Sequence, residues 1–349
     1  MARGGRPLSQ VARVRAQPSR QLRLQQGGAR HHVDDFLATC VNRCRLLDLA
    51  QRFQDRFGEV KSQSGDVLSY VGTTIQIERT DESVSVRMTM GKAIGDILAE
   101  SAVEGVAQTP AADNIFDVKD APLLSEDRRK RLHRLVAMTL YTAQRVRPDL
   151  LLPVSFLSSR VTCATEDDDA KLTRMLRYLN GTREVGIVLS CSLPILLSCY
   201  ADASFAVHSD RKSHSADLCK IGDGLVSARS YKQKLVTKSS GESEFVCGSD
   251  AVSTAVGHRN FLIEQGHEMP PVVLYQDNTS AIALAQKGKP ASDRTRHVDI
   301  RYFFVKDMID SGDFAIEYLA SDMMLADVLT KPIQGARYVA MRDQLLNWH

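Results

Sequence analysis

The chain has 349 residues, too many for one ordinary domain and enough for two. Hydrophobic residues make up 43% of it, and 45 Lys and Arg against 42 Asp and Glu leave a net charge of +3. No run of about 18 apolar residues occurs, which excludes a membrane-spanning helix. Seven cysteines scattered singly argue against a disulfide-stapled secreted fold and indicate a reducing, intracellular compartment, either cytoplasmic or nuclear.

The N-terminal segment is basic: residues 1–33 hold seven Arg and two His but no acid. Because such a stretch has too few large apolar side chains to offset the entropy of ordering, we expect residues 1–31 to form a disordered basic tail. Three interpretations of this tail stay open. It is a segment that binds nucleic acid, the product of a misjoined reading frame, or an organelle transit peptide, for which it is poor in Ser.

Beyond the tail, apolar residues recur with the periods of regular structure. An amphipathic helix is predicted around residues 42–57, and strands over 67–77 and 83–90, joined by a polar turn, predict a hairpin. A loop-rich segment follows over 103–124. Three helices are then predicted, from Ser125 to before Pro148, over 150–160, and from after Thr165 to Gly181.

From residue 184 the pattern changes, because strands now alternate with helices. Strands are predicted over 185–189, 195–201, 272–276 and 314–319, and helices over 242–262, 279–287, 294–309 and from near Asp322 to before Pro332. This alternation is typical of an α/β sandwich around a mixed sheet.

Two acidic residues stand at the ends of predicted strands. Asp202 closes the strand 195–201, and Asp277 follows the strand 272–276. Sites in open α/β sheets gather at the carboxyl ends of strands, so both residues lie where chemistry usually occurs. An Asp at such a position also commonly makes a turn or caps a helix, and neither residue alone decides between these roles.

The helix after Ser239 offers two further acids, Glu242 and Glu244. Two residues apart on a helix, they point about 200° apart, so only one of them faces the sheet. Counting helical steps from Glu244 gives a small, apolar stripe: Cys247, Gly248, Ala251, Val252 and Ala255. Glu244 is therefore predicted to point inward and Glu242 outward. A buried carboxylate at position 244 needs a cation or a hydrogen-bond network.

The last acid of interest, Asp327, lies in a short apolar helix. Together with Asp202, Glu244 and Asp277 it makes a set of hard oxygen ligands, which suits Mg²⁺ or Mn²⁺. A zinc site is the weaker alternative, since the nearest Cys/His group, made of Cys40, Cys44, His31 and His32, lacks the spacing of a zinc site.

Five strings of the second half, in order along the chain, resemble the ribonuclease H domain of copia-type retrotransposon Pol polyproteins. They are Tyr200–Ser204, Ser239–Phe245, Leu274–Ile282, Arg294–Tyr302 and Leu325–Pro332. Upstream, Val33–Asp35 resembles the end of the reverse transcriptase aspartate motif, and Arg145–Asp149 and Met175–Thr182 resemble its thumb and connection region. The resemblance covers about residues 32–340.

The resemblance implies a ribonuclease H-like mixed sheet flanked by helices, preceded by a truncated reverse transcriptase palm remnant and a helical thumb or connection segment. The expected organisation is a disordered tail over 1–31, the reverse transcriptase remnant over 32–183, the ribonuclease H-like domain over 184–340, and a C-terminal tail over 341–349. Residues 190–340 are expected to fold on their own, and nothing in the sequence sets an oligomeric state.

The family also implies a function. Asp202, Glu244, Asp277 and Asp327 correspond to its metal-binding catalytic carboxylates, which would hold a pair of Mg²⁺ or Mn²⁺ ions and hydrolyse the RNA strand of RNA–DNA hybrids. Four basic residues are expected to hold the hybrid backbone, although a solvated surface is an equal alternative for them: Arg211, Lys212, Lys232 and Lys234.

Two further expectations concern activity. Asp34 and Asp35 would be vestiges of a polymerase site, because no acid precedes them to supply the carboxylate of an earlier palm strand. His32, Ala216 and Ala228 stand where the family usually has an aromatic residue, a Gly and a Trp. These departures leave a second hypothesis open, a catalytically inactive nucleic-acid-binding remnant of a retrotransposon.

Overall fold

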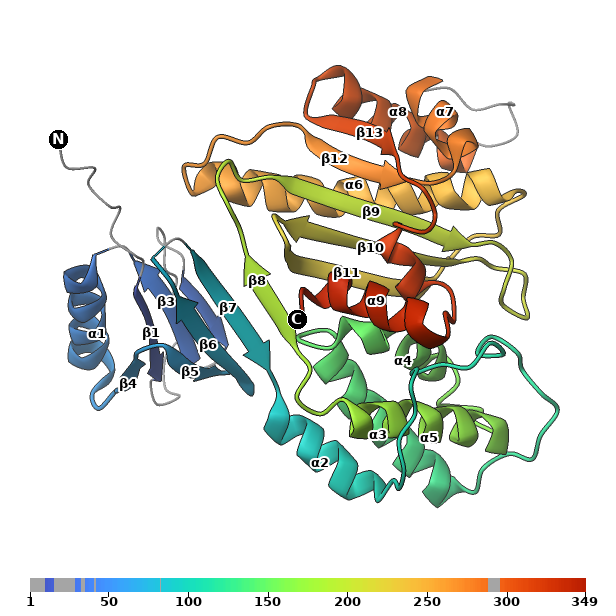
Figure 1. The fold of residues 1–349 in the computed structure, drawn as a ribbon, viewed down its shortest axis with the longest axis horizontal. Helices are drawn as coiled ribbons and strands as arrows, with labels where there is room; N and C mark the ends of the chain where they lie inside the picture. The colour runs from blue at the N-terminus through green and yellow to red at the C-terminus, as the bar shows by residue number, and fades with distance from the viewer. Residues whose placement is uncertain (1–9, 16–28, 33–34, 41, 82, 288–295) are drawn as a thin grey trace. The chain divides into compact units, whose positions relative to one another are not determined.

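The computed structural model describes residues 10–15, 29–32, 35–40, 42–81, 83–287 and 296–349 (Figure 1). The chain forms two compact units, Met1–Met90 and Gly91–His349, and each is considered by itself. Among the helices that the structure describes, none is long and apolar enough to cross a membrane.

The described part of the first unit contains two antiparallel sheets and one helix. One sheet has the order β2-β3-β1-β4, and the strands β5, β6 and β7 pair in sequence in the other. The strands are β1 (Gln10–Arg15), β2 (Ala29–His32), β3 (Asp35–Cys40), β4 (Lys61–Ser64), β5 (Val67–Tyr70), β6 (Thr73–Arg79) and β7 (Val84–Thr89). Helix α1 (Arg43–Phe57) is capped by the Asn42 side chain, which accepts a hydrogen bond from the Cys44 amide at 2.9 Å, so the predicted helix is confirmed.

Two predictions for this unit need correction. β1 (Gln10–Arg15) and all but the last residue of β2 (Ala29–His32) fall within 1–31, which was predicted to be a disordered tail, and both strands pair with β3. Backbone pairing thus orders a stretch whose side chains alone gave little reason to fold. The strand predicted over 67–77 is two strands, because Val71 and Gly72, both with positive φ, form a tight turn between β5 and β6.

The second unit opens with helices. They are α2 (Gly91–Ser101), α3 (Glu126–Ala143), the short 3₁₀ helix η1 (Pro148–Leu150), α4 (Leu151–Ser158) and α5 (Glu166–Gly181). The three predicted helices are confirmed, while α2 was not predicted. Thr165 and Asp168 form a capping box at the start of α5, since the Asp168 side chain accepts from the Thr165 amide at 2.9 Å.

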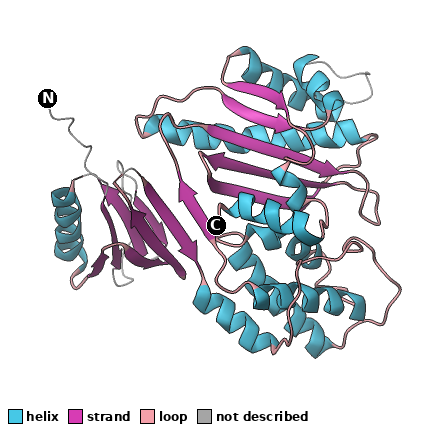
Figure 2. Cartoon of the chain, viewed as in Figure 1, coloured by secondary structure: helices cyan, strands magenta, loops and turns pink. Residues whose placement is uncertain are grey.

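The centre of the second unit is a sheet flanked by helices (Figure 2). The sheet is mixed and five-stranded, with the order β11-β10-β9-β12-β13. Its strands are β9 (Leu197–Ser204), β10 (His214–Ile221), β11 (Gly224–Lys232), β12 (Val272–Gln276) and β13 (Phe314–Tyr318), with the short strand β8 (Ile187–Ser190) before them. β9, β10 and β11 are antiparallel neighbours, whereas β12 runs parallel to both β9 and β13.

Helix α6 (Ser240–Glu264) covers one face of this sheet, and the opposite face meets the 3₁₀ helix η2 (Leu325–Leu329) (Figure 1). The predicted small stripe lies in the core, since Cys247, Ala251 and Ala255 are fully buried against Cys199 and Ala201 of β9. Small residues on both sides let the helix lie close to the sheet. The remaining helices are α7 (Thr279–Lys287), α8 (Arg296–Asp310) and α9 (Gly335–Leu346).

The expected boundary at residue 184 does not separate two compact units. The second unit runs from Gly91 to His349, so the helical segment and the mixed sheet form one body. Contacts across the expected boundary include the Tyr338 hydroxyl, which donates to the Asp149 carbonyl at 3.2 Å, and the Thr109 hydroxyl, which donates to Gln334 Oε1 at 2.8 Å. The expected tail 341–349 is also wrong, because α9 buries Leu345 and Leu346.

A buried ion pair lies at the centre of these contacts. Arg147 and Asp149 are both fully buried and form two hydrogen bonds, at 3.0 and 2.7 Å. Tyr178 donates to the same Asp149 carboxylate at 2.6 Å, and Arg147 also donates to the Thr182 carbonyl at 2.7 Å. All polar atoms of the pair therefore have partners, which is the condition for tolerating buried charges.

The contacts across residue 184 generate a prediction for fragments. A fragment of residues 91–349 should fold cooperatively, whereas one of residues 184–349 should aggregate or melt without a transition, because it exposes the surface that α4 and η1 cover. Circular dichroism melting of both fragments checks this expectation. If the fragment 184–349 melts in a cooperative transition like that of the longer fragment, the domain boundary predicted at residue 184 is supported instead.

The buried pair generates a second prediction. Asp149→Asn leaves the Arg147 charge buried without a counter-charge, so the free energy of unfolding should fall by about 3–5 kcal/mol, measured by urea denaturation. The matched control is Glu126→Gln, which removes an exposed partner of Lys130 and should cost less than about 1 kcal/mol. Equal losses in the two variants would contradict this account.

Candidate metal and catalytic site

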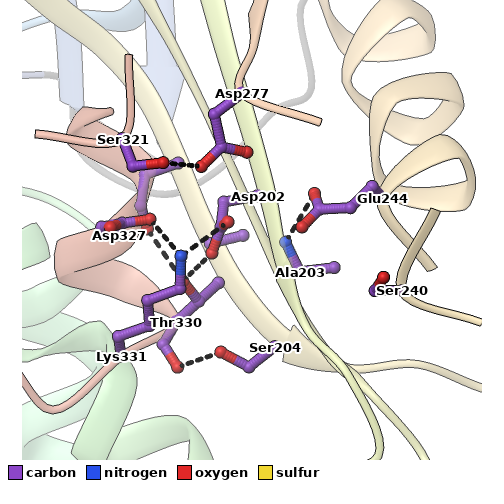
Figure 3. A network of polar contacts seen from close by, with 12 residues as sticks. Asp202, Ala203, Ser204, Ser240, Glu244, Asp277, Ser321, Asp327, Thr330 and Lys331 are labelled. Atoms are coloured by element: carbon purple, nitrogen blue, oxygen red, sulfur yellow. Dashed lines mark hydrogen bonds and ion pairs between the residues drawn. The ribbon is translucent and has the colours of Figure 1, made fainter. Parts of the chain in front are cut away.

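Three aspartates meet at one end of the mixed sheet (Figure 3). β9 and β12 are parallel neighbours with Tyr200 beside Tyr275, so Asp202 and Asp277, each two residues further on, come together. Asp327 joins them from η2. One carboxylate oxygen from each of the three lies within 4.8 Å of the others. Asp202 and Asp327 are buried and Asp277 is half-buried.

The predicted position of Asp202 needs a small correction. It does not close its strand but lies inside β9, which continues to Ser204. Asp277 follows β12 directly, as predicted, and its carboxylate accepts a hydrogen bond from the Ser321 hydroxyl at 2.8 Å. Both carboxylates therefore depend on the sheet register for their separation, and a shift by one residue would turn one of them to the other face.

Asp327 is positioned by hydrogen bonds to the backbone around it. The Ser230 hydroxyl of β11 donates to the Leu329 carbonyl at 2.7 Å, and the Ser204 hydroxyl of β9 donates to the Thr330 carbonyl at 3.0 Å. Thr330 in turn donates its hydroxyl to the Asp202 carboxylate. These contacts fix η2 to the sheet and so hold Asp327 beside Asp202.

Glu244 approaches from α6 but lies outside the three-oxygen group (Figure 3). It is 6% exposed, which agrees with the predicted inward orientation, and its Oε2 accepts a hydrogen bond from the Ala203 amide at 3.0 Å. Burial, followed by the negative charges of Asp202 and Asp277, raises the pKa of Glu244 to about 9. This carboxyl group is therefore close enough to Asp202 and Asp277 to be affected by their charges.

The predicted outward orientation of Glu242 is wrong. Its exposed fraction is only 9%, and its Oε2 accepts a hydrogen bond from the Lys238 amide at 2.8 Å. The Ser239 hydroxyl accepts from the Glu242 amide at 3.2 Å. In the first turn of a helix an acidic side chain bends back to satisfy free amides, and helical periodicity does not account for this.

Lys331, which was not predicted to belong to the site, places a cation between two of its carboxylates. Lys331 Nζ lies 2.6 Å from Asp327 Oδ1 and 3.1 Å from Asp202 Oδ1. Burial lowers the pKa of Lys331, but the two carboxylates outweigh this effect and leave its pKa above the ordinary value. Burial and the charge of Asp202 raise the pKa of Asp327 to about 6, against the effect of Lys331. The spacing of four residues between Asp327 and Lys331 was an available signal.

The four predicted hybrid-binding residues divide into two pairs. Lys232 Nζ lies 2.8 Å from Asp210 Oδ2 and Lys212 Nζ lies 3.8 Å from the same oxygen, so one carboxylate partly neutralises both. Arg211 and Lys234 are exposed. The register pairs Lys232 with His214 and His214 with Ser204, which places Lys232 at the same end of the sheet as Asp202. Their role in binding stays a prediction.

The predicted vestigial polymerase residues belong to the first unit. Asp34 lies outside the described residues, and Asp35 begins β3 opposite Arg15 of β1. Cys40 and Cys44, considered as part of a weaker zinc site, are both free thiols. Within the described part of the chain, the three aspartates form the one group of acidic, His or Cys residues close enough to hold a metal ion.

The fold and this site define a mixed α/β protein with an oxygen-ligand cluster at one end of its sheet. No protein-family model matches the chain. It is 33% identical over 194 residues to the retrovirus-related Pol polyprotein from transposon RE2 of Arabidopsis thaliana, and 30% identical over 209 residues to that from transposon TNT 1-94 of Nicotiana tabacum. Retrovirus-related Pol polyproteins from copia-type transposons are thus homologues of this chain.

These matches cover 55% and 60% of this chain but only 13% and 16% of the two polyproteins. A shorter match, 35% identical over 122 residues and 35% of this chain, covers 86% of the secreted RxLR effector protein 161 of Plasmopara viticola. Among solved structures, the N-terminal RNase H domain of a Mycobacterium tuberculosis protein, fused to maltose-binding protein, aligns with 42% of this chain and 96% of that one at 12% identity and a TM-score of 0.28.

The raised pKa of Glu244 generates a prediction about stability and pH. In the metal-free protein the folded state binds the proton of the Glu244 carboxyl group more tightly than the unfolded chain does. The stabilisation of the folded state by this proton is therefore complete below about pH 4 and is lost as the pH rises toward 9. Glu244→Gln keeps an acceptor for Ala203 and cannot ionise. At pH 8 the free energy of unfolding of this variant should therefore be at least about 1 kcal/mol higher than that of the parent.

Urea denaturation in EDTA at pH 5 and pH 8 measures this difference, which should be much smaller at pH 5. The matched control is Glu264→Gln, an exposed residue at the other end of α6, which should leave the pH dependence unchanged. If Glu244→Gln retains the full pH dependence of the parent, Glu244 is not the group responsible.

Proposed function

We propose that this chain hydrolyses the RNA strand of RNA–DNA hybrids, as the ribonuclease H part of a copia-type retrotransposon polyprotein. The observation that carries the proposal is the meeting of Asp202, Asp277 and Asp327, drawn from three elements far apart in sequence, within 4.8 Å. A structural role alone would not require three acidic groups to gather where their charges repel. The Pol polyprotein homologues and the mixed sheet flanked by helices agree with this assignment.

The donor atoms of the site fit Mg²⁺ or Mn²⁺. All of them are carboxylate oxygens, which hard divalent cations prefer, and no Cys or His belongs to the group. Asp202, Asp277 and Asp327 would hold the ions, and Glu244 would complete the set on the α6 side. When bound, such ions lower the pKa of water and stabilise a leaving oxygen, which is the chemistry that hydrolysis of a phosphodiester needs.

The protein supplies position and charge around that chemistry. Ser321 orients the Asp277 carboxylate, and Thr330 orients that of Asp202, so the ligand oxygens are held before substrate arrives. We propose that Arg211 and Lys234, exposed near the same end of the sheet, contact the hybrid backbone. Lys212 and Lys232 share Asp210 and would contribute less. Recognition would follow the shape and charge of the duplex, without reading bases.

The proposal is tested by Asp277→Asn, which keeps the shape of the side chain and its contact with Ser321 but removes one anionic ligand. Cleavage of a labelled RNA–DNA hybrid with Mg²⁺ should fall at least 100-fold, which corresponds to about 3 kcal/mol or more in the activation barrier. Hybrid binding in Ca²⁺ should persist or strengthen slightly, because a negative charge near the backbone is lost.

The matched control is Asp322→Asn, an exposed acid in the loop between Ser321 and η2, which should cleave like the parent. Loss of cleavage in Asp277→Asn with cleavage retained in the control supports the assigned site. Equal cleavage by all proteins would show that the activity arises elsewhere. Absence of cleavage by the parent, with hybrid binding retained, would favour the inactive remnant instead.

A further inference from the structure

We propose that Lys331 is a built-in counter-ion, which occupies a cation position between Asp202 and Asp327 and must leave it when a divalent ion binds there. The inference rests on the proposed function, since it assumes that the aspartates bind a divalent cation. It gives a role to Lys331, which contacts two of the proposed metal ligands but is not itself a ligand.

The contacts of Lys331 are those expected of a cation in the site. Its ammonium group lies 2.6 Å from Asp327 Oδ1 and 3.1 Å from Asp202 Oδ1, and so bridges two of the three carboxylates (Figure 3). Both carboxylates are almost completely buried. Each carries a negative charge that is costly to bury without a positive partner nearby. The lysine therefore stabilises an arrangement of aspartates that would otherwise repel each other.

The backbone of Lys331 is held in place, whereas its side chain is partly exposed and can move. Its amide donates to the Asp327 carbonyl at 2.8 Å, which fixes its backbone one turn beyond Asp327. Its side chain is 40% exposed. The ammonium group can therefore move to solvent by rotation about its own side-chain bonds, with no change in η2. A flexible, strongly hydrated ammonium group is suited to this movement.

The aspartates remain supported without the lysine. Thr330 still donates to Asp202, Ser321 still donates to Asp277 at 2.8 Å, and Arg337 lies 3.7 Å from Asp327 Oδ2. The ligand geometry is thus maintained by neutral donors and a more distant cation. Lys331 contributes mainly charge, and this charge competes with an incoming cation for the same oxygens.

The competition predicts opposite effects on the metal-free and the metal-bound protein. Lys331→Met removes the competing charge and keeps much of the apolar stem. Its affinity for Mn²⁺ should increase about tenfold or more, measured by isothermal titration calorimetry on the full chain. Its melting temperature in EDTA should fall, because the aspartates then repel without compensation, and the increase on adding Mn²⁺ should exceed that of the parent.

The matched control is Lys306→Met, which removes a lysine paired with an aspartate four residues away, on α8. It should bind Mn²⁺ like the parent. Lys331→Gln is measured in parallel, so that poor folding of the methionine variant does not decide the result. Tighter Mn²⁺ binding by a folded Lys331 variant supports the proposal.

Two results would overturn it, and they are distinguishable. If the parent binds Mn²⁺ and the folded Lys331 variants bind it equally or more weakly, Lys331 supports the ligands and does not compete with the ion. The proposed nuclease function would survive that result. If neither the parent nor the variants bind Mn²⁺, the metal-dependent function itself fails, and the counter-ion role fails with it.

Discussion

The repulsion between buried carboxylates is the constraint on which this site depends. Asp202, Asp327 and Glu244 are all less than a tenth exposed, and Asp277 stands beside them. Burying several like charges together is unfavourable unless protons or cations compensate. The protein uses both, since the pKa of Glu244 is raised to about 9 and Lys331 bridges two aspartates. The same repulsion would favour binding of the divalent cations that the proposed nuclease requires.

Rigid support for these charges comes from beyond the mixed sheet. The helical segment after Gly91 belongs to the same compact unit, and the buried Arg147–Asp149 pair connects η1 with α5 and, through Tyr338, with α9. Helix α9 follows directly after the loop that carries Thr330 and Lys331. The helices that the resemblance assigns to the thumb and connection region thus contribute to holding η2, and with it Asp327, against the sheet.

Much of the candidate site could be predicted from the sequence because the acidic residues proposed as ligands lie at simple positions in the predicted elements. Asp277 directly follows a strongly apolar strand, and the small stripe beginning at Cys247 decided which side of α6 faces the sheet. The errors have physical causes as well. β10 was not predicted, because its many polar residues hide a strand that is buried between β9 and β11. Glu242 was predicted to point outward because helical periodicity takes no account of capping in the first turn.

The sequence by itself determined the chemical nature of the site and the elements that carry it, because hydrophobic periodicity and strings such as Leu274–Ile282 are local properties of the chain. Only the tertiary structure decided which groups meet. The register of β9 against β12 brings Asp202 to Asp277, and η2 brings Asp327 to both. Lys331, just after η2, reaches Asp202 and Asp327. Distances between residues fifty or more positions apart depend on packing and strand register, and no local pattern contains them.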